Sequence, residues 1–209
     1  MILKLRDCSP RKKAGLGATL AEQHMSSVAK VVAEGSLPQG SLVLLDFSEI
    51  EAVNASYIKG TAFWLLTCGQ MSTRSVESQL SPRHSADPRP YDLYVCVTGL
   101  APALVEEFQE FLKPRGLPLL HASRVKGEKV EEARLLGHLD SALLQTLKVL
   151  SCEGRATAPQ LFEANTKEGV TVTAWNNRLN DLNGLRLVRR FRAGRAWEYE
   201  TIARKLLWE

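Results

Sequence analysis

Residues 171–200 read TVTAWNNRLNDLNGLRLVRRFRAGRAWEYE, and this stretch decides the fold of the C-terminal part of the chain. Four of its apolar residues fall on one side of a helix with 3.6 residues per turn: Val172, Trp175, Leu179 and Leu182. After Gly184, apolar residues alternate with arginines, which is the period of a β-strand. A turn at residues 193–195 then reverses the chain. The stretch therefore predicts a helix followed by a β-hairpin.

Two shorter helices are predicted just before this stretch. Apolar residues recur every three or four positions in the first one: Leu139, Ala142, Leu143, Leu147 and Leu150. Asp140 stands near its start, and Gly154 marks its end. The second helix covers residues 156–164, with Thr157 as its cap and Pro159 in the first turn, where proline is tolerated. The segment thus combines three helices with a β-hairpin.

The polar side of the predicted third helix has the chemistry of DNA recognition. Asparagine and arginine can form paired hydrogen bonds to adenine and guanine edges in the major groove. The hairpin adds a local excess of arginine, which the neutralisation of phosphates requires. Our candidate DNA contacts are Thr173, Asn176, Asn177, Arg178, Asn180, Arg189, Arg190, Arg192 and Arg195.

Residues 139–200 resemble the winged helix-turn-helix domain of bacterial transcription regulators of the multiple-antibiotic-resistance type. The residues that carry the resemblance are 173–182 as recognition helix, Leu187–Arg190 entering the wing, Gly194 and Arg195 at its tip, and Tyr199 leaving it. The resemblance implies that residues 172–182 enter a major groove of double-stranded DNA while wing arginines meet phosphates. Such regulators usually carry glycine just before the Leu-Val pair, where this chain has Arg186, so we expect a reshaped turn there.

The first half of the chain alternates strands with helices. Strands are predicted at residues 1–5, 41–47, 91–97 and 117–122. Helices are predicted at residues 17–34, 55–66 and 101–112. This order predicts an α/β fold with a central sheet. Residues 70–90 interrupt it with the composition of a mobile loop.

We predict two domains, an α/β domain at residues 1–125 and a winged helix-turn-helix domain at residues 135–209. The stretch 126–134 between them is highly charged and carries a glycine, so it is the predicted hinge. Residues 126–209 hold 14 basic and 11 acidic residues, and the whole chain has a net charge of only +4. DNA binding would therefore depend on local clustering of arginines.

A second motif, LLDFSEIEAVNASYI, occupies residues 44–58. An apolar strand ends there at Asp46, and a small polar cluster opens a helix that Asn54 can cap. The motif resembles the STAS fold of sulphate transporters and anti-sigma-factor antagonists, and more closely the STAS-like domains of unclassified bacterial proteins, over residues 40–122. The resemblance implies a partner of the kinase or ATPase type and Ser56 as phospho-acceptor, since a phosphate near a helix N-terminus meets the positive end of the dipole. In the alternative, Ser56 is an ordinary first-turn residue.

The sequence does not favour catalysis, a cofactor or a metal site. The cysteines, Cys8, Cys68, Cys96 and Cys152, are far apart and mostly sit inside apolar runs, which is typical of reduced core thiols. The four histidines show no ligand spacing with one another or with the cysteines. Nothing at the N-terminus resembles a signal peptide, and no apolar run is long enough to span a bilayer. We therefore expect a soluble, cytoplasmic protein that is not an enzyme.

Taken together, the sequence predicts a bacterial DNA-binding regulator whose STAS-like domain binds a partner or senses a signal. The alternative is an adaptor that does not bind DNA. In it, the STAS-like domain docks on a kinase or ATPase, and the winged helix mediates protein contacts. A homodimer would match a symmetric operator, although no dimerisation helix stands out in the sequence.

Overall fold

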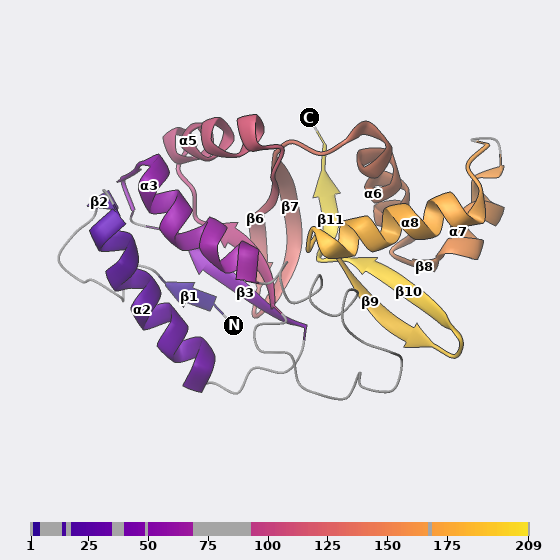
Figure 1. Ribbon diagram of the computed structural model, residues 1–209, viewed down its shortest axis with the longest axis horizontal. Coiled ribbons are helices and arrows are strands. Elements are labelled where there is room, and N and C mark those ends of the chain that lie inside the picture. Colours follow the sequence, from indigo (N-terminus) through magenta and orange to yellow (C-terminus); the bar gives the residue numbers. More distant parts are fainter. Residues whose placement is uncertain are drawn as a thin grey trace.

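The protein has a mixed α/β fold, as its sequence predicts, in a computed structural model shown in Figure 1. The structure describes residues 2–4, 14–15, 18–34, 40–48, 50–68, 93–166 and 169–208. The loop expected at residues 70–90 lies outside the described residues, and so does Cys8.

Six strands form one mixed sheet in the order β1-β3-β5-β6-β7-β11. These strands are β1 (Ile2–Lys4), β3 (Ser41–Asp46), β5 (Leu93–Thr98), β6 (Pro118–Lys126), β7 (Lys129–Gly137) and β11 (Ala203–Leu207). Neighbouring strands are parallel except β6 and β7, which pair as an antiparallel hairpin. A separate two-stranded sheet joins β2 (Ala14–Gly15) to β4 (Ala52–Val53). The predicted strands at residues 1–5, 41–47, 91–97 and 117–122 are thereby confirmed.

Helices cover one face of the six-stranded sheet (Figure 1). They are α2 (Ala18–Glu34), α3 (Ala55–Ile58) with its π-helical continuation η1 (Lys59–Phe63), and α5 (Pro102–Leu112) with the 3₁₀ turn η2 (Lys113–Arg115). Side chains alternate across a strand, so Val43 and Val95 face these helices. At Gly60 a Cβ would lie 2.7 Å from the Cβ of Ala21, and glycine therefore lets η1 approach α2 closely.

A C-terminal unit covers the other face of the sheet. It consists of α6 (Ser141–Glu153), β8 (Arg155–Thr157), α7 (Ala158–Ala164), α8 (Val172–Gly184), β9 (Val188–Ala193) and β10 (Ala196–Thr201). Its strands form a small antiparallel sheet in the order β8-β10-β9. Leu44 and Cys96 of the large sheet share a core with Trp175 and Leu179 of α8. The two halves of the chain therefore pack as layers around one sheet.

The predicted starts of the helices are confirmed by their caps. The side chain of Asn54 accepts a hydrogen bond from the backbone of Tyr57, and Asp140 caps α6. Thr157 and Gln160 form a reciprocal capping box at α7, which tolerates proline in its first turn. These signals are local, so the sequence alone is enough to identify them.

The stretch expected to be a hinge, residues 126–134, is not a linker. It contains the end of β6, a two-residue turn with Gly127 at φ 59°, and the first six residues of β7. After β10 the chain returns to the large sheet, where β11 pairs in parallel with β7. The boundaries predicted at 125 and 135 therefore fall within a β-hairpin of the central sheet. Its charged side chains are mostly exposed or only partly buried, and this composition resembles that of a linker.

Candidate nucleic-acid interface

Helix α8 is anchored by one buried side and presents the opposite side to solvent. Trp175, Leu179 and Leu182 are fully buried, and each such side chain stabilises the fold by roughly 1.5–3 kcal/mol. Thr173 and Asn177 are exposed on the other side. Two further candidates on α8, Asn176 and Arg178, are partly exposed. The N-terminal half of α8 therefore offers polar side chains in the way that the helical repeat predicts.

Asn180 holds α8 against the hairpin. The hydroxyl of Tyr199, which is itself fully buried, donates a hydrogen bond to Oδ1 of Asn180 over 2.8 Å. One turn further along, Nδ2 of Asn183 donates to the Tyr94 hydroxyl and to the Val188 carbonyl, both at 2.9 Å. These bonds tie the C-terminal half of α8 to strands on both sides. Asn180 is thus engaged inside the protein, unlike Asn177.

The hairpin carries a guanidinium cluster on one of its two faces. We call Arg190, Arg192 and Trp197 the outer cluster. The guanidinium carbons of Arg190 and Arg192 lie 4.6 and 4.0 Å from the centroid of the Trp197 ring. Arg192 is exposed, and so is Arg195 at the hairpin turn. Stacking on an indole face holds a guanidinium in place and leaves its N–H donors available at the edge.

Arg189 points to the opposite face of β9, because neighbouring residues in a strand alternate. We call Arg186, Arg189 and Tyr94 the inner cluster. The guanidinium carbons of Arg186 and Arg189 lie 5.0 and 5.4 Å from the centroid of the Tyr94 ring. Nε of Arg189 is buried without a hydrogen-bond partner among the described residues. The hairpin arginines therefore divide between a face that meets Tyr94 of the central sheet and a face that packs on α8 through the buried Tyr199 and reaches solvent at Arg192.

Arg186 adopts a backbone conformation that usually requires glycine. Its φ is 63°, in the left-handed region, and its side chain is 2% exposed. The reshaped turn expected at this position is thus a left-handed turn that carries a buried arginine. Sequence reasoning did not identify the inner cluster, although the departure from glycine at Arg186 was a signal for it.

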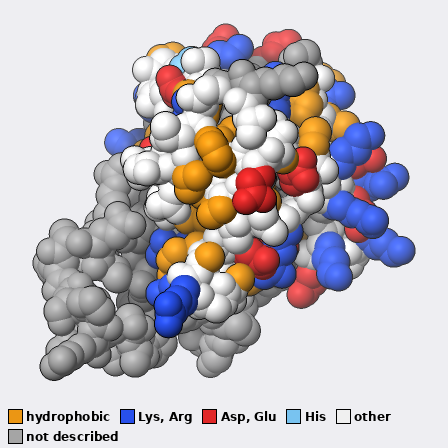
Figure 2. Space-filling view, turned by 90° about the vertical axis from the view of Figure 1, so that its right-hand side faces the viewer, with side chains coloured by type: hydrophobic (Ala, Val, Ile, Leu, Met, Phe, Trp, Pro, Cys, Tyr) orange, Lys and Arg blue, Asp and Glu red, His pale blue; other side chains and the backbone are white. Residues whose placement is uncertain are grey.

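The far end of the C-terminal unit has a mixed surface (Figure 2). Lys and Arg side chains gather along one margin of this view, while hydrophobic and acidic side chains occupy its centre. Phe162 of α7 and Val172 of α8 are each 37% exposed. The surface is therefore cationic in part only.

Ser56 is exposed in the first turn of α3, and Asn54 caps that turn. The neighbouring Tyr57 points into the core, where its hydroxyl lies 2.6 Å from Nδ1 of His24. Burial lowers the pKa of His24 from its ordinary value. The ring of Tyr57 is therefore turned into the core, and the side chain of Ser56 stays exposed.

The cysteines divide according to their exposure. Burial raises the pKa of Cys96 to about 12, and the charge of Arg189 opposes this shift in part. Cys96 is therefore a neutral core thiol at physiological pH. Cys152 is exposed and Cys68 is half-buried, and burial also raises the pKa of Cys68.

Among the residues that the structure describes, no group of three or more His, Cys, Asp and Glu side chains could hold a metal ion. Within the same ranges, no helix is long and apolar enough to cross a membrane. Comparisons of the chain with protein-family models, with curated proteins and with solved structures found no match.

Proposed function

We propose that the protein is a bacterial DNA-binding regulator that contacts duplex DNA through α8 and the β9–β10 hairpin. The observation that carries the proposal is the order of elements in the C-terminal unit, α6–β8–α7–α8–β9–β10, with the strands arranged β8-β10-β9. This is the order of a winged helix, in which the third helix enters the major groove and the hairpin forms the wing.

The polar end of α8 supports this proposal. The exposed Asn177 can read a base edge, and Thr173 can contact base or phosphate. The partly exposed Asn176 and Arg178 flank these positions. Because α8 meets the sheet through its C-terminal half, its N-terminal half is the part that faces away from the sheet.

The wing supplies the phosphate contacts in this proposal. Arg192 and Arg195 are exposed towards the turn of the hairpin, Arg190 is partly exposed, and the Trp197 ring orients Arg190 and Arg192. A positioned guanidinium loses less conformational entropy when it binds a phosphate. Arg189 and Asn180 are assigned supporting roles instead, because their side chains contact the protein's own sheet and hairpin.

The sheet and its helices α2, α3 and α5 would form the STAS-like domain of the regulator. Ser56 is accessible at the start of α3, in the place that the resemblance gives to a phospho-acceptor. A kinase or ATPase partner would recognise this end of the domain. Incubation with a cell extract and ATP, followed by mass spectrometry of wild type and Ser56→Ala, tests the site. Phosphate on another residue in both proteins contradicts it.

The surface at the end of α7 favours a second candidate function, an adaptor. Phe162 of α7 and Val172, the first residue of α8, expose apolar surface. Exposed apolar groups of this kind suit a protein partner better than a phosphate backbone. In this alternative the wing arginines are a solvated face, and the protein does not bind DNA.

Salt dependence of DNA binding distinguishes the two functions. A double variant Arg192→Ala and Arg195→Ala should bind all DNA sequences more weakly and reduce the log–log salt slope by about 2. Asn177→Ala should instead change the preference among sequences in a selection from random DNA. Arg124 and Arg204 are also exposed, with 65% and 82% of their side chains accessible, but they lie on β6 and β11.

The double variant Arg124→Ala and Arg204→Ala is therefore the matched control, since it removes the same charge from strands of the central sheet instead of the hairpin. Equal losses for both double variants would mean that only net charge matters. If wild type does not bind DNA at low salt, the regulator proposal fails and the adaptor remains.

A further inference from the structure

A pocket of about 600 Å³ lies where the central sheet meets the base of the wing. The β6–β7 turn and β7 form one wall, and the opposite wall comes from the inward face of the small sheet, at Arg155, Arg189 and Glu200. Leu42, Val130 and Ile202 add apolar surface. Pockets of this size and mixed lining at the junction of two structural units are typical of sites for small molecules.

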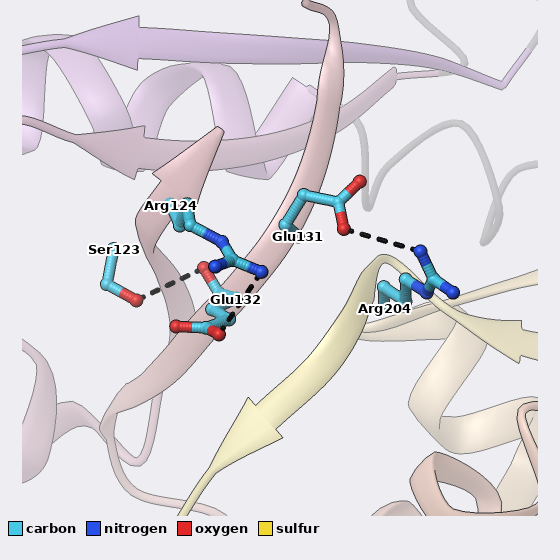
Figure 3. A network of polar contacts seen from close by, with 5 residues as sticks. All are labelled: Ser123, Arg124, Glu131, Glu132 and Arg204. Atoms are coloured by element: carbon cyan, nitrogen blue, oxygen red, sulfur yellow. Dashed lines mark hydrogen bonds and ion pairs between the residues drawn. The ribbon is translucent and has the colours of Figure 1, made fainter. Parts of the chain in front are cut away.

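Three of the charged residues that line the pocket have ion-pair partners within the protein: Glu131, Arg155 and Arg204. Glu131 of β7 pairs with Arg204 of β11 over 3.6 Å, as Figure 3 shows beside the contacts of Glu132 with Arg124 and Ser123. Arg155 pairs with Glu198 over 2.8 Å. Four basic and three acidic residues line the pocket, so its lining carries little net charge.

Arg189 differs from the other cations of the pocket. Its Nε is buried and has no hydrogen-bond partner among the described residues, while its guanidinium carbon lies 5.4 Å from the Tyr94 ring centroid. Arg189 also lines the pocket. A guanidinium pairs bidentately with carboxylates and phosphates through its two terminal nitrogens, so an oxyanion in the pocket suits this residue.

We propose that this pocket binds a small molecule with one carboxylate or phosphate group, held by Arg189, and an apolar remainder that packs on Leu42, Val130 and Ile202. Glu200 faces Arg189 directly across the β9–β10 pairing. Its carboxylate limits the affinity for anions, so a ligand with a single oxyanion group fits better than a polyanion.

The ligand would regulate DNA binding, an effect that depends on the proposed function. Arg189 is adjacent to Arg190 on β9, and its side chain lies behind the outer cluster. An anion bound there lowers the positive potential of the wing, within about one Debye length of the phosphates. DNA affinity should therefore fall severalfold when the pocket is occupied.

Binding is tested on the whole chain with three probes of similar size: benzoate, phenyl phosphate and benzyl alcohol. At 10 mM, benzoate or phenyl phosphate should raise the thermal unfolding midpoint by about 2 °C or more, while uncharged benzyl alcohol should not. The comparison between the two anions identifies the preferred oxyanion. Arg189→Met keeps the aliphatic stem and should abolish the shift.

Arg192→Met is the matched control, since it removes the same group from the outward face of the same strand. It should respond to the anions as wild type does. In Glu200→Gln the anions should raise the unfolding midpoint by more than they do in wild type. This gain tests the site even if Arg189→Met does not fold. The proposal is overturned if neither anion shifts wild type, if benzyl alcohol shifts it equally, or if Arg189→Met responds normally.

DNA affinity is then measured with and without the effective anion at constant ionic strength. The anion should lower the DNA affinity of wild type severalfold, and it should leave the DNA affinity of Arg189→Met unchanged. If the anion shifts the unfolding midpoint but wild type binds no DNA, anion binding in the pocket is supported and the proposed function fails. If wild type binds DNA equally well with the pocket occupied, the regulatory role is overturned.

Discussion

The inner and outer clusters contain the same chemical groups in different surroundings. Each places two guanidiniums against one aromatic ring, Tyr94 in the inner cluster and Trp197 in the outer one. Tyr94 is 5% exposed, whereas Trp197 is only partly buried and Arg192 is exposed. Burial therefore separates a cluster that joins the wing to the sheet from a cluster that can meet a partner. Four arginines that look alike in sequence have two roles.

The largest expected effect is a loss of stability when the inner ring is removed. Tyr94→Ala should lower the free energy of unfolding by about 3–5 kcal/mol, because it leaves a cavity and removes the acceptor for Asn183. Trp197→Ala should cost only about 1 kcal/mol, since the ring is partly exposed. Urea unfolding curves of both variants provide the measurement. Similar losses would show that the two clusters do not differ in structural role.

The second prediction concerns DNA affinity and reverses this order. Trp197→Ala frees the guanidiniums of Arg190 and Arg192, so DNA binding should weaken about tenfold, or about 1.4 kcal/mol. Fluorescence anisotropy with labelled duplex DNA at fixed salt measures this loss. Trp197→Phe, which keeps an aromatic face, is the control and should recover most of the affinity. An unchanged affinity in the alanine variant would remove the outer cluster from the interface.

How far the sequence predicts these features depends on the range of each interaction. Asn54 and Thr157 act within one helical turn, so their caps could be predicted. The division of Arg189 from Arg190 follows from strand alternation, but which face of the hairpin meets the sheet depends on tertiary packing. The local sequence pattern therefore predicted Arg189 as a DNA contact together with the other arginines.

The hinge prediction failed for a related reason. Charged residues around Gly127 have the composition of a linker, yet they form a hairpin whose partner β11 lies about seventy residues further along the chain. The local sequence pattern at residues 126–134 does not predict the pairing of β7 with β11. The boundaries between domains are thus harder to predict from sequence than the helices and strands themselves.

The third prediction concerns the backbone strain at Arg186. Both Arg186→Ala and Arg186→Gly remove the buried guanidinium, but only glycine adopts the left-handed conformation freely. Each variant should be less stable than wild type, and the alanine variant should be less stable than the glycine variant by about 1 kcal/mol. Thermal and urea unfolding of the three proteins give the comparison. A glycine variant more stable than wild type would mean that the inner cluster does not compensate for the strain.

The smallest expected effect comes from the hydrogen bond between α8 and the hairpin. Tyr199→Phe removes the hydroxyl that donates to Asn180, so stability should fall by about 1 kcal/mol. If Asn180 only positions α8, the specificity of DNA binding should stay unchanged, in contrast with Asn177→Ala. Selection from random DNA with Tyr199→Phe and Asn180→Ala provides the measurement. A changed base preference in Asn180→Ala alone would place Asn180 at the DNA, beyond its bond to Tyr199, and would move the boundary between supporting and contacting residues one turn along α8.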